Sequence, residues 1–211
     1  MITDNALHLR TDWETHVGPD IVTGGKVPDH YGSLTYGDMM VLYCEGRANS
    51  GWMNAIHRPI LPNSGMCSLY FEMLNDSEVL ANCQAQEFDF IYTKDNFKYN
   101  FSNQINQSQG GTWQISDENG LWVDTGLKPT KITSVWTSFQ FSYRWYEDTK
   151  LYQTVSVKIA GVTYMVPPRL HQIKAKGTNW EDFATVQIQQ DLGSKGGRMS
   201  QAHRGMNLVW L

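Results

Sequence analysis

The stretch QEFDFIYTKDNFKYNFSNQ, residues 86–104, decides the fold class of this 211-residue chain. Aromatic residues occupy alternate positions on both sides of TKDN, and mostly polar residues lie between them. A period of two is that of a β-strand with one buried face. The central TKDN predicts a four-residue turn between two antiparallel strands. In that register Tyr92 pairs with Phe97 and Glu87 with Ser102, which places all six aromatic residues on one face.

The same alternation recurs along the chain, whereas helical periodicity is nearly absent. Gly, Asn, Asp and Pro separate the alternating runs, and the first 38 residues predict loops and one edge strand. Further strands are predicted at MMVLYC (39–44), MCSLYFEML (66–74), TSFQFSYRWY (137–146), LYQTVSVKI (151–159), VTYMV (162–166), FATVQIQQDL (183–192) and MNLVWL (206–211). We therefore expect one all-β domain over residues 1–211, built as a two-sheet antiparallel sandwich.

The charge and the apolar content of the chain limit the classes of partner that we expect it to bind. The formal net charge is −4 and the pI is about 5.8, so the basic surface typical of nucleic-acid binding is not expected. No apolar run approaches the roughly 18 residues of a membrane-spanning helix. The N-terminus has no apolar signal core, which predicts a cytoplasmic protein or a secreted one whose leader has been removed.

The three cysteines do not predict a metal site. Cys44, Cys67 and Cys83 show no C-x-x-C spacing, and each lies in or beside an apolar run. Buried free thiols are the simplest interpretation. A Cys67–Cys83 disulfide is the alternative in an oxidising compartment.

The polar faces of the predicted strands are rich in Gln, Asn and Ser. These groups make directional hydrogen bonds without the desolvation penalty of full charges, which suits a carbohydrate groove. An ordinary solvated sheet face is the alternative. Trp52, Trp113 and Trp122 lie near glycine or loop residues and could stack on a sugar ring, although core packing is the simpler role. The expected lining of the groove is Glu87, Asp89, Asn100, Gln104, Gln140, Arg144, Gln187 and Gln189.

Three segments resemble a known family. SVWTSFQFSY (134–143), VSVKIAGVTYMV (155–166) and GMNLVWL (205–211) resemble the closing strands of the concanavalin A-like lectin/glucanase superfamily. The resemblance is strongest over residues 134–211. It implies a two-sheet jelly roll, a face that meets glycans and, in many members, a structural calcium ion. DENG (117–120) could offer oxygens to calcium, but it lacks the Asp-x-Asp-x-Asp spacing.

The same resemblance suggests two kinds of enzyme. Glu87 and Asp89 match the first two carboxylates of the E-x-D-x-E or E-x-D-x-x-E motif of laminarinase-like relatives, but Ile91 or Tyr92 stands in place of the third, which is the proton donor. A polysaccharide lyase is therefore preferred to a glycoside hydrolase, with Tyr146 or His57 as the base. Local lyase signatures are absent from the chain. The predicted catalytic residues are Glu87, Asp89 and Tyr146, and the predicted substrate-binding residues are His57, Asn100, Gln104, Gln140, Arg144, Gln187, Gln189 and Trp113.

The function expected from the sequence is therefore carbohydrate binding or polysaccharide processing, with an oligo- or polysaccharide as the partner. The alternative is a non-catalytic sandwich with a structural or protein-interaction role.

Overall fold

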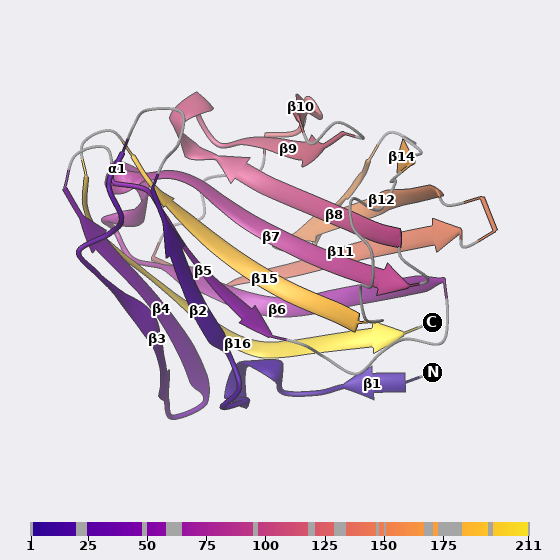
Figure 1. Ribbon diagram of the computed structural model, residues 1–211, viewed down its shortest axis with the longest axis horizontal. Helices are drawn as coiled ribbons and strands as arrows, with labels where there is room; N and C mark the ends of the chain where they lie inside the picture. The colour runs from indigo at the N-terminus through magenta and orange to yellow at the C-terminus, as the bar shows by residue number, and fades with distance from the viewer. Residues whose placement is uncertain are drawn as a thin grey trace.

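The chain folds into two antiparallel β-sheets that lie one over the other, as the sequence predicts (Figure 1). In the orientation of Figure 1, β7, β8 and β15 lie in front of β6 and β11. The computed structural model describes residues 2–19, 25–47, 50–57, 65–94, 97–117, 121–128, 134–146, 148–149, 151–166, 171–172, 183–193 and 196–210.

The rear sheet, sheet A, contains nine of the described strands. Its order is β13-β12-β11-β6-β16-β4-β3, with β1 beside β16 and β14 beside β12. Because β1 pairs with the end of β16, both chain termini lie at the same edge (Figure 1). The strands are β1 (Ile2–Asp4), β3 (His30–Tyr36), β4 (Met39–Gly46), β6 (Met66–Asn75), β11 (Thr137–Tyr146), β12 (Leu151–Ile159), β13 (Val162–Met165), β14 (His171–Gln172) and β16 (Gly197–Trp210).

The front sheet, sheet B, contains seven of the described strands in the order β10-β9-β8-β7-β15-β5-β2. These are β2 (Glu14–Gly18), β5 (Trp52–His57), β7 (Cys83–Lys94), β8 (Phe97–Asn106), β9 (Thr112–Ser116), β10 (Trp122–Asp124) and β15 (Phe183–Leu192). The described helical turns are η1 (Leu7–Leu9), α1 (Val79–Asn82) and η2 (Gln107–Gln109). None of these short turns has the length or apolar character of a membrane-crossing helix.

Aromatic side chains fill the space between the sheets. Phe88 and Phe90 on β7 are fully buried. Their rings lie 5.4 Å from Phe71 on β6 and 5.5 Å from Tyr143 on β11, measured between ring centroids. Aromatic pairs at these separations add to the large apolar area that each ring removes from water. The aromatic residues that alternate in QEFDFIY therefore form part of the core that sheet B contributes.

The register of the β7–β8 hairpin differs from the prediction by two residues. Tyr92 pairs with Tyr99 and Glu87 with Gln104, because the strands continue to Lys94 and Phe97 and leave only two residues between them. A shift of two preserves the face of every side chain, since side chains alternate with a period of two. The five predicted core aromatics of the hairpin whose side chains are described are accordingly buried: Phe88, Phe90, Tyr92, Tyr99 and Phe101.

The prediction for the first 38 residues was wrong, because β1, β2 and β3 all form there. Edge strands explain the error. β2 ends the order of sheet B and β3 ends that of sheet A. All but two residues of β3 are exposed, so its sequence shows no clean apolar alternation.

The cysteine prediction is confirmed in its simplest form. Cys44, Cys67 and Cys83 are free and buried. Burial raises the pKa of the Cys67 thiol well above its ordinary value. The alternative Cys67–Cys83 disulfide is not formed.

Candidate functional site

The outer face of sheet B gathers polar side chains from several strands. We use this name for the positions that alternate with the core residues, since neighbouring side chains of a strand point to opposite sides. The outer face comprises Trp52 on β5, Glu87 and Asp89 on β7, Asn100, Ser102 and Gln104 on β8, Gln114 on β9, and Gln187, Gln189 and Asp191 on β15. Six predicted groove residues lie here: Glu87, Asp89, Asn100, Gln104, Gln187 and Gln189.

Amides and carboxylates alternate across β7 and β15. Gln187 pairs with Asp89, and its Nε2 donates to Asp89 Oδ2 at 2.8 Å. Gln189 is the cross-strand partner of Glu87, and its Nε2 donates to Asp191 Oδ1 at 3.0 Å. A hydrogen bond to an ionised acceptor is stronger than a neutral one, so these amides hold the carboxylates in place.

Buried amides on β8 and β9 form a hydrogen-bonded chain that ends at the exposed Gln109 on η2. Gln104 Nε2 donates to Gln114 Oε1 at 2.5 Å, and Gln114 Nε2 donates to Gln109 Oε1 at 3.0 Å. Gln104 and Gln114 expose only 3% and 5% of their surface. Asp89 is also almost fully buried, whereas Glu87, Gln187, Gln189 and Asp191 are half-buried. Groups accessible to a ligand therefore lie mainly along β15.

The acids on the outer face influence one another. Burial raises the pKa of Glu87 to about 10, and the neighbouring charges of Asp89 and Asp191 add to the shift. Glu87 is also hydrogen-bonded to Asp191. Glu87 is consequently protonated at neutral pH and is the donor in that hydrogen bond. The sequence suggested that the chain lacks a proton-carrying carboxyl group, but Glu87 itself is one.

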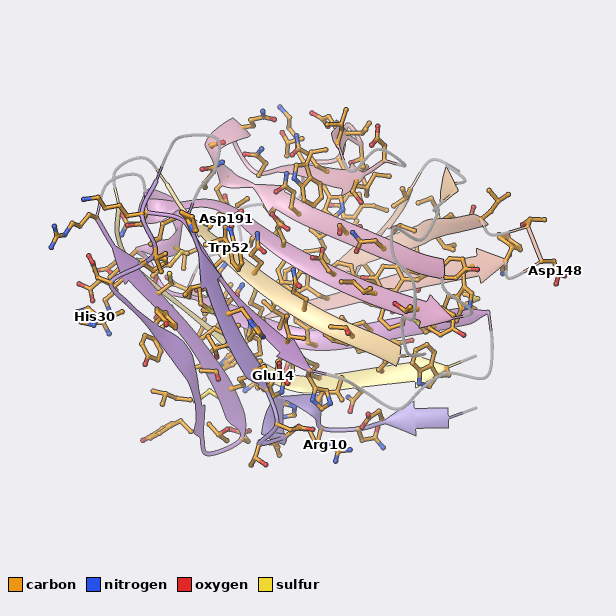
Figure 2. All side chains as sticks on the ribbon, in the orientation of Figure 1. Arg10, Glu14, His30, Trp52, Asp148 and Asp191 are labelled. Carbon is orange, nitrogen blue, oxygen red and sulfur yellow. The ribbon has the colours of Figure 1, made fainter. Side chains whose placement is uncertain are left out.

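A pocket of about 220 Å³ lies at one end of the outer face. Trp52 and Asp191 form a cross-strand pair of β5 and β15, and both line it. Figure 2 shows Trp52 and Asp191 next to each other, far from Asp148. The lining is completed by Pro19, Ser50, Gly51, Gln84, Gln189 and Leu192. An aromatic ring thus lies beside a carboxylate and two amides.

A glycine fixes the position of Trp52. Gly18 on β2 is the cross-strand partner of Trp52. A Cβ atom at Gly18 would overlap Cζ2 of the indole, so the ring lies directly over the glycine backbone. Only a residue without a side chain permits this approach.

Solved structures share this arrangement of strands. Lectin I-B4 from Griffonia simplicifolia, in its metal-free form, matches with a TM-score of 0.56 over 99% of both chains, at 7% identity. An alginate lyase mutant in complex with an alginate tetrasaccharide matches with a TM-score of 0.54, over 85% of this chain and 83% of that chain, at 10% identity. The chain has the concanavalin A-like jelly-roll fold.

A third structure extends the likeness to a binding module. The CBM2 module of the evolved Dit of Lactobacillus casei BL23 phage J-1 matches with a TM-score of 0.53 at 10% identity, over 99% of this chain and 96% of that module. At such identities the likeness concerns the fold alone. No family model and no curated protein matches the sequence.

Within this jelly roll, three predicted site residues lie on the other sheet. Gln140, Arg144 and Tyr146 belong to β11, at positions of sheet A that point away from the core. Gln140 Nε2 donates to the hydroxyl of Tyr70 at 3.2 Å, on the same sheet. The prediction that Gln140 and Arg144 line one groove with Glu87 was wrong, and Tyr146 cannot act as a base there. Alternation assigns a face of a strand, but it does not assign the strand to a sheet.

Two further predicted residues belong to the interior. His57 is 3% exposed, and its ring packs 5.3 Å from that of Trp13. Trp113 is fully buried and lies parallel to Phe88 at 6.5 Å. Neither can contact a ligand on the outer face, so both predictions were wrong. Neighbouring glycine and loop residues suggested an exposed Trp113, although the alternation of TWQIS places Trp113 with Ile115.

Asp191, Ser50 and Gln84 line the pocket although the sequence did not predict them as site residues. Asp191 continues the alternation of Thr185, Gln187 and Gln189, so this signal was present. Ser50 and Gln84 carry no comparable signal, because only the folded chain brings them to the pocket. The described residues contain no group of three or more His, Cys, Asp or Glu side chains that could hold a metal ion. Within them, the calcium ion that the resemblance implied therefore has no such set of ligands. Residues 118–120 of DENG lie outside the described residues.

Proposed function

We propose that the chain binds carbohydrate on the outer face of sheet B, with one sugar ring in the Trp52 pocket. The observation that carries this proposal is the meeting of Trp52, Asp191 and Gln189 in one pocket. The apolar face of an indole packs against the C–H groups of a sugar ring. The carboxylate and amide groups hydrogen-bond to its hydroxyl groups.

The size of the pocket supports a small ligand unit. Drug-sized ligands occupy pockets of roughly 300–1,000 Å³, whereas this one measures about 220 Å³. A single ring fits that volume better than a longer segment. Further sugar residues would lie along β15, where Gln187 and Gln189 are half-buried. The lectin, lyase and binding-module structures of the same fold add support by analogy.

Isothermal titration calorimetry with a panel of neutral, amino and acidic oligosaccharides tests the proposal. Trp52→Ala and Gln189→Ala should each weaken binding at least tenfold, because each removes one wall of the pocket. Gln140→Ala is the matched control, since it removes an amide from sheet A. Its affinity should equal that of the unaltered chain.

Two results would contradict the proposal. Binding that survives Trp52→Ala would place the ligand elsewhere. If every glycan in the panel fails to bind, a structural or protein-interaction role becomes the better interpretation.

Glycoside hydrolysis is a second candidate, favoured by the raised pKa of Glu87. A glycosidase needs one protonated and one ionised carboxyl group at the scissile bond. Glu87 holds a proton beside Asp89 and Asp191. Release of reducing ends from a bound glycan, lost in Glu87→Gln, would establish this activity. Retained binding without new reducing ends would leave a binding protein.

The outer face offers less support for a lyase. Elimination from a uronate needs a group that offsets the sugar carboxylate, and Arg144 lies on the other sheet. Five acids occupy outer-face positions, namely Glu14, Glu87, Asp89, Asp124 and Asp191, and no Arg or Lys side chain is described among them. Absorbance near 235 nm with a polyuronate, which reports the unsaturated product, is expected to stay constant.

A further inference from the structure

The lining of the Trp52 pocket contains a single charged residue. Asp191 is a carboxylate, whereas the other lining residues carry no charge. Asp191 accepts a hydrogen bond from Gln189 at 3.0 Å. The carboxylate offers its negative charge to a ligand in the pocket.

Acidic groups adjoin the pocket on β7, whereas the backbone of Lys26 pairs with Ser50 in its lining. Glu87 is hydrogen-bonded to Asp191. Asp89 lies on the same side of β7, two residues further along the strand. Because Glu87 is protonated, the negative charges on these adjacent strands are those of Asp89 and Asp191, and their buried or half-buried setting reduces screening by solvent. A negative ligand is repelled here, and a positive one is attracted.

A buried hydroxyl in the pocket wall provides an independent sign of a polar ligand. Ser50 is 1% exposed and lines the pocket. Its Oγ packs against Gly46 and has no hydrogen-bond partner among the residues that the structure describes. Buried hydroxyl groups are normally hydrogen-bonded, so an unmatched one beside a pocket suggests a partner supplied by the ligand.

We infer that the Trp52 pocket selects a sugar ring that carries an amino group, with the ammonium bound to Asp191. This inference rests on the proposed carbohydrate binding and specifies the class of sugar. Trp52 provides the stacking surface for the ring. The amino group supplies the positive charge that the lining residues lack and donates hydrogen bonds to the carboxylate. Uronic acids are excluded by the same charges.

Calorimetry with matched oligosaccharides tests the selectivity. The probes are glucosamine, N-acetylglucosamine, glucose and glucuronate oligomers of one length, at one pH and low salt. We expect the glucosamine oligomer to bind at least tenfold more tightly than the glucose and N-acetylglucosamine oligomers, and the glucuronate oligomer not to bind. Raising the salt should reduce the preference, since it screens the charge interaction.

Asp191→Asn separates charge from shape. The asparagine keeps an oxygen that accepts from Gln189, so we expect the fold and the affinity for the glucose oligomer to be retained. The preference for the amino sugar should disappear. Asp148→Asn is the matched control, because Asp148 is exposed and lies at the far end of the molecule (Figure 2). The Asp148→Asn variant should keep the preference for the amino sugar.

The outcomes distinguish this inference from the proposed function. Equal affinity for the amino and neutral oligomers would overturn the charge selectivity and leave carbohydrate binding intact. Tighter binding of the glucuronate oligomer would do the same. Failure of all four oligomers to bind would overturn both.

Discussion

The amide side chains of Gln86 and Asn75 hydrogen-bond to each other in both directions between the two sheets. Gln86 Nε2 donates to Asn75 Oδ1 at 2.9 Å, and Asn75 Nδ2 donates to Gln86 Oε1 at 3.3 Å. Both residues are fully buried. Beside them Gln190 Nε2 donates to Gln201 Oε1 at 3.1 Å. Amides thus join sheet B to sheet A at one end of an otherwise aromatic core.

Replacement of Gln86 by Leu should destabilise the chain by about 1–3 kcal/mol, because a buried amide of Asn75 loses both hydrogen bonds to its partner. The free energy of unfolding in urea measures the effect. Gln84→Leu is the control, since Gln84 is exposed on the same strand. It should change stability by about 0.5 kcal/mol or less. Equal losses in the two variants would contradict the buried amide pair.

Glu87→Gln should stabilise the chain at alkaline pH. The pKa of Glu87 rises from 4.5 to about 10 on folding, chiefly through burial. Its contribution is complete below pH 4.5 and is lost as pH rises toward 10, because the unfolded chain releases the proton more readily. Glutamine stays neutral, so we expect a gain of roughly 1–3 kcal/mol at pH 8 and little change at pH 4.

Urea unfolding at pH 4 and pH 8 measures this difference. Glu45→Gln is the matched control, since Glu45 is exposed on β4. A pH dependence that is the same in Glu87→Gln as in the unaltered chain would show that Glu87 is ionised in the folded state.

His203→Leu should reduce the loss of stability in acid. Burial, followed by the charge of His8, lowers the pKa of His203 to about 3 from 6.5. Between these values only the unfolded chain binds the proton, so stability is full above pH 6.5 and falls toward pH 3. His8 is also buried, and its lowered pKa acts in the same direction.

Between pH 6.5 and pH 4, His203→Leu should lose roughly 3 kcal/mol less than the unaltered chain. Urea unfolding at the two pH values measures the difference. His16→Gln on the exposed surface of β2 is the control and should follow the unaltered chain. An unchanged acid response in His203→Leu would contradict a neutral buried histidine.

Gly18→Ala should weaken glycan binding by moving Trp52, because the added Cβ overlaps the indole. We expect a loss of about tenfold or more in affinity and a shift in tryptophan fluorescence. Gly32→Ala is a matched control on sheet A, where the Cβ would meet the ring of Tyr43 in the same way. Its glycan affinity should be retained. If both variants bind equally well, the position of Trp52 does not matter for the ligand.

The sequence alone determined the longer alternating strands and their faces. The limits of β11, β12 and β15 follow the alternating runs 137–146, 151–159 and 183–192. Glu87 and Asp89 lie on the outer face although the hairpin register shifted by two. Alternation is a local property of an extended backbone, so it can be read from neighbouring residues.

Only the tertiary structure decided which strands share a sheet. Asp89 and Gln187 are hydrogen-bonded across 98 positions of the chain, whereas Gln140 carries the same pattern on the opposite sheet. The Trp52 pocket likewise depends on the pairing of β5 with β15 and β2. Pairing between distant segments is set by the packing of the whole core, and no local pattern in the sequence records it.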